Sequence, residues 1–137
     1  MTIRNIFDVA GSAMSAQMQR LNTTASNLAN AQAVSTTAEE AYRPLRPVFE
    51  TVYADSLQQG ALSTAQVTDV ITLDRDPERR FQPDHPMADT EGYVFAAAVD
   101  PDEEMVEMME ASRQYQNILE TVSTLRTLMA RTVQMGQ

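Results

Sequence analysis

The chain has 137 residues and a formal net charge of −9 at pH 7, a length that suits one hydrophobic core and argues against a second. It contains no cysteine, which excludes disulfide frameworks and thiolate metal sites. Its acidic centre opposes phosphate, so nucleic acid is not an expected partner, and no apolar run approaches the roughly 20 residues of a membrane-spanning helix.

The first 34 residues carry one stripe of apolar side chains at intervals of three and four positions, the period of an α-helix. The stripe consists of Ile3, Phe7, Ala10, Met14, Met18, Leu21, Ala25 and Leu28. Ser, Thr and Asn are frequent in the same segment, and each is less favourable in a helix than Ala by roughly 0.5 to 1 kcal/mol. We therefore expect a helix that is weak alone and forms fully when a partner covers its stripe.

Three asparagines, Asn22, Asn27 and Asn30, lie within nine residues of this segment. An asparagine side chain competes with the helical backbone for hydrogen bonds, so the group weakens a helix that must still form. It indicates hydrogen bonds across a helix–helix interface, or a defined helix end. A polar face that only meets water is the plainer alternative.

Residues 35 to 99 have a different character, because five prolines between positions 44 and 86 prevent long helices. Residues 47 to 53, 67 to 73 and 92 to 95 are rich in β-branched and aromatic side chains, which predicts short strands. Residues 54 to 66 and 74 to 91 are predicted to be connections. This middle segment is expected to be small and β-rich.

Residues 100 to 137 again predict a long helix. Asp100 can cap it, Pro101 suits its first position, and Glu103 stands where a capping box places an acid. Its stripe averages 3.5 residues, the repeat of a coiled-coil seam. The stripe consists of Met105, Met108, Ser112, Tyr115, Leu119, Val122, Leu125, Met129 and Val133.

No motif for chemistry emerges, so no catalytic residue, cofactor or metal is expected. The only histidine, His85, lies between prolines and is more typical of a turn than of a site with three or four ligands. The acid pairs Glu39–Glu40 and Glu103–Glu104 are interpreted as solvated or as matching the helix dipole. The methionine-rich stripe of the last helix is interpreted first as core packing.

Residues 15 to 31, SAQMQRLNTTASNLANA, resemble the N-terminal signature of bacterial flagellar axial proteins, the rod and hook class, which share S-A-Q-x-x-R-L-(N/D)-x-x-A-x-N-(L/I)-A-N. Further similarity lies in residues 3 to 12, 84 to 94, 111 to 116 and 132 to 137, so it covers nearly the whole chain.

The resemblance implies a fold that is mainly α with a small β part. The helices of residues 1 to 34 and 100 to 137 would form a coiled-coil-like pair, one inner domain, with residues 35 to 99 outside. It implies a non-enzymatic structural subunit of the proximal rod of the basal body, a tube that transmits torque and conducts exported subunits. Other rod proteins, copies of itself and the flagellar type III export apparatus would be its partners. The expected location is the rod in the periplasmic space, reached without a cleaved signal peptide.

Assembly roles are carried over to the positions that match the family signature. These are Ser15, Gln17, Arg20, Leu21, Asn22, Ala25, Asn27, Leu28, Asn30, Ser112, Arg113, Tyr115 and Gln116. With the two apolar stripes they make up the expected assembly interface. A secreted helical adaptor or export-chaperone-like module, with its helices paired in a stable dimer, is the alternative. A small periplasmic hydrolase would need a triad or metal site that the sequence does not offer.

Overall fold

The computed structural model describes residues 3 to 53 and 63 to 135 of the chain. Two helices, α1 (Ile3–Asn30) and α2 (Pro101–Met135), enclose the strands in sequence. The strands are β1 (Val34–Ser35), β2 (Leu45–Tyr53), β3 (Ser63–Thr72), β4 (Arg79–Phe81) and β5 (Tyr93–Ala96). The expected fold class, mainly α with a small β part, is therefore confirmed.

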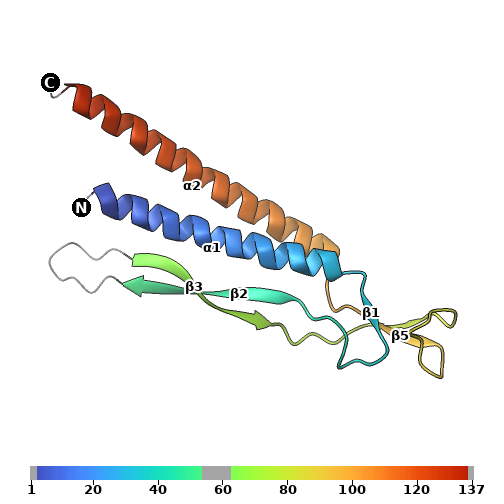
Figure 1. Cartoon of the computed structure of the whole chain (residues 1–137). Helices are drawn as coiled ribbons and strands as arrows, with labels where there is room; N and C mark the ends of the chain where they lie inside the picture. The colour runs from blue at the N-terminus through green and yellow to red at the C-terminus, as the bar shows by residue number, and fades with distance from the viewer. Residues whose placement is uncertain (1–2, 54–62, 136–137) are drawn as a thin grey trace.

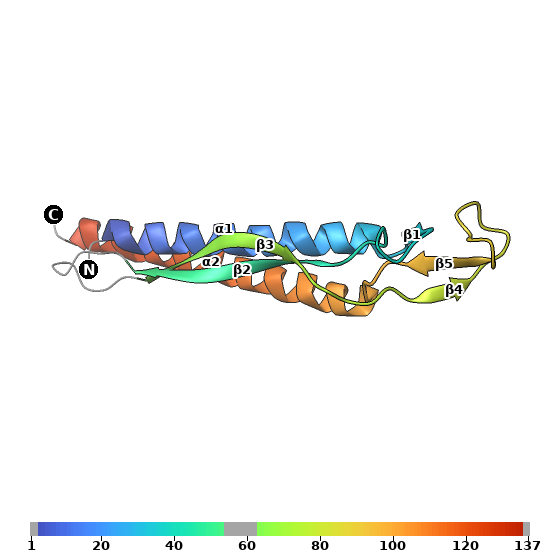
Figure 2. The same cartoon turned by 90° about the horizontal axis from the view of Figure 1, so that it is seen from below.

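All parts of the molecule run along one long axis, with α1 between α2 and the β2–β3 hairpin (Figure 1). The helices are antiparallel, so both termini lie at one end, and the two helices move apart towards it. We call this the open end; it comprises residues 3 to 14 of α1 and 119 to 135 of α2. At the other end, the junction, the last turns of α1 meet the first turns of α2, and the small sheet lies beyond it (Figure 2).

The hairpin of β2 and β3 is antiparallel, with Leu45 opposite Thr72 and Tyr53 opposite Ser63. Its register shifts between Val48 and Phe49, whose partners are Asp69 and Val67; a bulge of this kind bends and twists a hairpin locally. Ser12 Oγ of α1 donates a hydrogen bond of 2.5 Å to the carbonyl oxygen of Ala65. This bond attaches the hairpin to α1, and the hairpin runs beside that helix (Figure 1).

The small sheet has the strand order β1-β5-β4, and both strand pairs are antiparallel. The turn before β5 depends on Gly92, whose φ of +82° is unfavourable for residues with a Cβ. A Cβ at this position would also lie 3.0 Å from the Phe81 ring and 3.1 Å from Pro83. Phe81 and Tyr93 pack edge to face at 5.1 Å, so Gly92 lets the turn close over this aromatic pair.

The buried part of the molecule is thin and built from small side chains. The buried apolar residues of the described chain are Ala16, Ala41, Pro44, Val94, Ala96, Ala97 and Ala111. The accessible surface is 9561 Å², whereas a compact monomer of 15.2 kDa is expected to expose about 7,100 Å². The excess shows that this elongated chain leaves uncovered much surface that a globular domain would bury.

Three details of the predicted middle segment are wrong. Ser63 to Gln66 belong to β3 and not to the connection predicted at 54 to 66, of which 54 to 62 lie outside the described residues. Strand β4 lies inside the predicted connection 74 to 91. It was not predicted because two of its three residues are arginines, which give no strand signal. Residue 34 was expected to be the last residue of the N-terminal helical segment. The helix ends at Asn30, and Val34 already belongs to strand β1.

Candidate assembly site at the helix junction

Asn27 of α1 is completely buried and joins three elements. Its Nδ2 donates to the Leu45 carbonyl oxygen (2.9 Å) and to Glu104 Oε2 (3.0 Å). Its Oδ1 accepts from the Leu45 backbone N–H (2.8 Å) and from the Tyr42 hydroxyl (3.1 Å). These four bonds use the full capacity of the amide, and the pair with Leu45 satisfies both backbone polar groups of that residue.

Glu104, in the first turns of α2, is 0% exposed. Arg46 of β2 donates from Nη1 to Glu104 Oε2 (2.8 Å), and its Nη2 lies 2.6 Å from Oε1. This second contact is an ion pair and not a directed hydrogen bond, since Oε1 accepts none within the described residues. A buried carboxylate is tolerated only when it is paired in this way, and the bond to Glu104 raises the pKa of Arg46.

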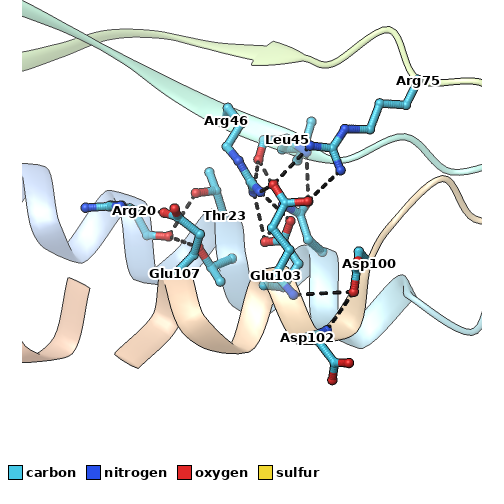
Figure 3. A network of polar contacts seen from close by, with 12 residues as sticks. Arg20, Thr23, Leu45, Arg46, Arg75, Asp100, Asp102, Glu103 and Glu107 are labelled. Atoms are coloured by element: carbon cyan, nitrogen blue, oxygen red, sulfur yellow. Dashed lines mark hydrogen bonds and ion pairs between the residues drawn. The ribbon is translucent and has the colours of Figure 1, made fainter. Parts of the chain in front are cut away.

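More exposed ion pairs surround this buried centre (Figure 3). Arg20 of α1 donates from Nε to Glu107 Oε2 of α2 at 3.0 Å. Arg75 donates to both oxygens of Glu103, at 2.8 and 3.0 Å, and this bond to Arg75 lowers the pKa of Glu103, with Arg46 adding to the effect. The junction is thus fixed by charge from both helices, from β2 and from the segment after β3.

The predicted start of α2 at Pro101, with Asp100 as its cap, is confirmed. Asp100 Oδ1 accepts from the backbone N–H of Asp102 (2.9 Å) and of Glu103 (3.4 Å), which satisfies donors that the first helical turn cannot pair internally. The Glu103 side chain, expected to complete a capping box, instead accepts from Arg75. It therefore ties the start of α2 to the segment that follows β3.

The interpretation of the acid pair Glu103–Glu104 as solvated or dipole-matching is wrong for Glu104, which is the most deeply buried charge of the described chain. Adjacent helical residues point about 100° apart, so the two acids have different surroundings. Glu104 and its partner Arg46 are the main residues that sequence reasoning missed. Arg46 lies 58 positions before Glu104, and no pattern in the sequence indicates that its side chain faces α2.

The buried face of α1 differs from its predicted apolar stripe. The buried residues are Ala16, Thr23, Thr24 and Asn27, and both threonine hydroxyls donate to the Arg20 carbonyl oxygen one turn earlier. Of the stripe, Ala25 is exposed and Met18 is 44% exposed, while Phe7, Ala10, Met14, Leu21 and Leu28 are half-buried. Small and polar residues of α1 therefore pack against the rest of the chain, and the apolar stripe lies half-buried or exposed.

The three asparagines have different roles. Asn27 bridges helices as described, whereas Asn30, the last residue of α1, donates to the Ser26 carbonyl oxygen of its own helix at 2.8 Å. Asn22 is exposed. The predicted interface bond and the predicted helix end both occur, and the plainer alternative of a solvated side chain holds for Asn22.

The apolar stripe of α2 is nowhere fully buried. Met105, Leu119 and Val133 are exposed, and the other members are half-buried. The default of core packing is wrong for Met105 and Met109, which are 51% and 60% exposed, because Glu104 and Ala111 occupy the inward face instead. Beyond Ala111 no described residue of α2 is buried.

Some of the expected interface residues lie together in the structure. Met14, Ser15, Met18 and Tyr115 line one shallow groove between the helices, with Gln19. Met108, Ser112, Arg113 and Gln116 line a second one on α2, with Met109. Gln17 is half-buried, and its Oε1 accepts no hydrogen bond within the described part of the chain. The side chain of Ile3 lies outside the described residues.

The described residues contain no cluster of three or more His, Cys, Asp or Glu side chains that could hold a metal ion. None of the helices in that part of the chain is long and apolar enough to cross a membrane. His85 Nδ1 accepts the backbone N–H of Met87 at 3.1 Å within a turn.

Two family profiles match the chain at its two ends. The profile described as flagella basal body rod protein matches residues 7 to 35. The profile described as flagellar basal body rod FlgEFG protein C-terminal matches residues 90 to 135. The two matches contain nearly all of α1 and α2 and the residues of the junction that those helices supply.

Full-length relatives agree with these matches. The flagellar basal-body rod protein FlgC of Yersinia enterocolitica is 44% identical, and that of Escherichia coli O6:H1 is 42% identical, each over 100% of both chains. The FlgC protein of Aquifex aeolicus is 34% identical over 96% of both chains. The resemblance found in the sequence is confirmed: the chain belongs to the FlgC family of flagellar basal-body rod proteins.

Proposed function

We propose that this chain, a structural subunit of the flagellar basal-body rod, joins its neighbours through the two helix faces left uncovered at the open end. The observation that carries the proposal is the contrast along α2, whose buried residues are Glu104 and Ala111, both near the junction. Leu119, Val122, Leu125 and Met129 continue an apolar stripe with no buried member. A stripe of this kind is expected to be covered in the assembled state.

The helix pair then forms the inner domain, and the hairpin and small sheet form the outer part. Other rod proteins and further copies of this chain would be its neighbours in a tube that transmits torque and conducts exported subunits. The large accessible surface supports this arrangement, because each subunit offers long contact faces in place of one compact patch. The absence of an expected catalytic motif fits a non-enzymatic role.

Export through the flagellar type III apparatus is part of the proposal, as is the final place of the subunit in the periplasmic part of the basal body. A thin core of small residues at the junction, with few large buried side chains, suits a chain that must pass a narrow channel and fold afterwards, since little apolar burial resists unfolding.

The test is a charged residue on the uncovered stripe. Leu125→Asp is expected to abolish swimming and to remove the subunit from isolated basal bodies, because a buried aspartate without a partner is strongly unfavourable at an interface. Thr124 is the residue before Leu125 and is exposed on α2. Thr124→Asp is therefore the matched control and should leave motility near normal. Secretion of both variants into the medium of a strain lacking the hook should match that of the unchanged chain. Normal incorporation of the Leu125→Asp variant would refute the proposed interface.

A further inference from the structure

A groove separates α1 from the first half of β3, which lies on the α1 side of β2 in both views (Figure 1, Figure 2). Its helix wall consists of Ser12, Ser15, Ala16 and Gln19, which lie three or four positions apart and therefore on one face of α1. Its other wall consists of residues 66 to 70 of β3. The groove has a volume of about 580 Å³, within the range of roughly 300 to 1,000 Å³ that is typical of ligand sites.

The backbone of β3 presents hydrogen-bonding groups to this groove. The Ala65 carbonyl oxygen accepts a hydrogen bond from Ser12 Oγ, so it points away from β2 and towards α1. The Val70 N–H donates to Asp69 Oδ1 at 2.7 Å, so it also points away from β2. In an antiparallel pair, residues with outward groups alternate with residues that are bonded to the partner strand. Val67, two positions after Ala65, therefore presents its N–H and carbonyl groups on the same edge.

The partner strand agrees with this alternation. Pro47 lies opposite Val70, and a proline is tolerated in a strand where its missing N–H would point outward. Leu45 uses both of its backbone groups for Asn27, so they point away from β3. Side chains thus satisfy outward groups of β3 at both ends of the groove, while the groups of Val67 between them form no hydrogen bond to another element of the described chain.

An outward strand edge of this kind is a template for a further strand. An extended peptide that lies between a sheet edge and a helix gains main-chain hydrogen bonds from the edge and side-chain contacts from the helix wall. A helical partner could not use the edge, because its backbone groups are already bonded within the helix. The geometry of the groove therefore selects an extended segment.

The side chains of the groove define the chemistry of that segment. Asp69 is the only charged residue on either wall, and it forms no ion pair among the described residues. Most of the other wall residues are polar and uncharged. A basic side chain next to Asp69 would complete the charge pairing. The described strands of this chain are already paired with one another, so the segment belongs to another protein.

We propose that the groove between α1 and β3 binds an extended, basic segment of another protein, which adds as a strand to the outer edge of β3. The segment pairs its backbone with the N–H and carbonyl groups of Val67, and its Lys or Arg side chain contacts Asp69. This site goes beyond the proposed function, whose contacts are the uncovered apolar stripes of the helices.

The test uses the isotope-labelled full chain and a panel of capped heptapeptides. The peptides consist of valine, threonine and serine and differ only in the position of a single arginine. Binding is followed through the backbone amide signals of the chain, and we expect shifts of residues 12 to 19 and 66 to 70. Replacing the arginine by glutamate should lower the affinity about tenfold, and methylating alternate backbone nitrogens of the peptide should abolish binding, because strand pairing needs those N–H groups.

Variants of the chain locate the site. Val67→Pro removes one outward N–H and should lower the affinity about tenfold. Thr51 lies opposite Ala65 on β2, so Thr51→Pro removes the equivalent donor from the other edge and is the matched control with unchanged affinity. Ser15 is exposed on α1, and Ser15→Tyr fills the groove without touching the hairpin. It should weaken binding as strongly as Val67→Pro, and circular dichroism checks the folding of each variant.

The proposal is overturned if no peptide of the panel shifts the groove signals, or if the shifts map to the outer edge of β2 or to α2. It is also overturned if the methylated peptide binds as tightly as its parent, or if Thr51→Pro and Val67→Pro reduce binding equally. Where Val67→Pro does not fold, Ser15→Tyr decides, and unchanged binding by that variant refutes the site.

Discussion

The junction and the open end of the helix pair differ in how their polar and apolar groups are satisfied. At the junction, Asn27 makes four hydrogen bonds, and Glu104, which is completely buried, is paired with Arg46. At the open end, the helices carry apolar residues that are half-buried or exposed, and none of those whose side chains are described is fully buried. The comparison teaches that one end of the subunit specifies its own structure, and the proposed function assigns the completion of the other end to its neighbours.

The difference also explains why a polar cluster occupies the junction. Apolar side chains allow two helices to slide past each other, whereas a buried ion pair and a saturated amide are satisfied in only one register. Glu104 and Asn27 therefore fix the relative position of α1 and α2 and dock β2 in the same step. The register set at the junction determines where the open ends of both helices point.

The largest effect is expected from removing Arg46, since Arg46→Met leaves Glu104 buried without its cation. Loss of one partner of a buried pair costs about 3 to 5 kcal/mol, to be measured by urea unfolding followed by circular dichroism. The double variant Arg46→Met/Glu104→Met should recover most of that loss. A loss below about 1 kcal/mol, the range of surface ion pairs, would show that Glu104 reaches water.

Replacement of Asn27 should come next. Asn27→Ala leaves the Leu45 N–H and carbonyl groups without their side-chain partner, and unsatisfied buried groups cost about 1 to 3 kcal/mol each. Asn22→Ala, on the exposed side of the same helix, is the matched control and should change stability by at most about 0.5 kcal/mol. Equal effects of the two variants would contradict the distinct roles assigned to the asparagines.

A smaller effect is expected at the start of α2. Asp100→Ala removes the acceptor for the N–H groups of Asp102 and Glu103, and loss of such a cap typically costs about 1 kcal/mol. Asp100→Asn keeps an acceptor and should restore most of the stability. The urea midpoint of each variant measures the difference, and an unchanged midpoint for Asp100→Ala would argue against a role of the cap.

The smallest effect is a dependence on pH. The bond to Arg75 places the folded-state pKa of Glu103 below its ordinary value of 4.5, so the unfolded chain binds protons more readily there. The stabilisation by this pair is complete above the unfolded pKa and is lost as pH falls through the lower folded pKa. Since the Glu103 side chain is 41% exposed, solvent screening keeps the effect small.

The pH dependence is measured by comparing urea midpoints of the unchanged chain and Arg75→Gln between about pH 6 and pH 3. The two midpoints should differ above about pH 4.5 and converge below it. Arg80→Gln, whose arginine pairs with the exposed Glu78, serves as the control for loss of one surface charge. A difference that grows towards acid pH would have the wrong sign for this explanation.

Much of the fold could be predicted from the sequence because its signals are local. The period of the apolar residues placed both helices, and Asp100–Pro101 marked the start of α2. The β-branched runs placed β2, β3 and β5 to within a few residues. Strand β4 was not predicted because Arg79 and Arg80 have no strand preference. The strand forms through its backbone pairing with β5 at an exposed edge of the sheet.

The candidate site could be predicted only in part. The asparagines predicted a hydrogen bond between helices, which Asn27 makes with Glu104. The rest of the buried face of α1 consists of Ala and Thr, which carry weak hydrophobic signals. Burial of Glu104 depends on Arg46, a residue 58 positions away, and no spacing rule within one element reveals such a pair. The apolar stripes are accounted for by the proposed assembly, in which neighbours cover the open end.

The central claim, that the junction is complete in the free subunit and the open end is not, is tested most directly by amide hydrogen exchange. The free subunit and isolated basal bodies are compared, residue by residue where peptides allow. We expect strong protection around Asn27 and Ala111 in both states, and protection of residues 119 to 135 only after assembly. Uniform strong protection along the whole of α2 in the dilute free subunit would contradict the account.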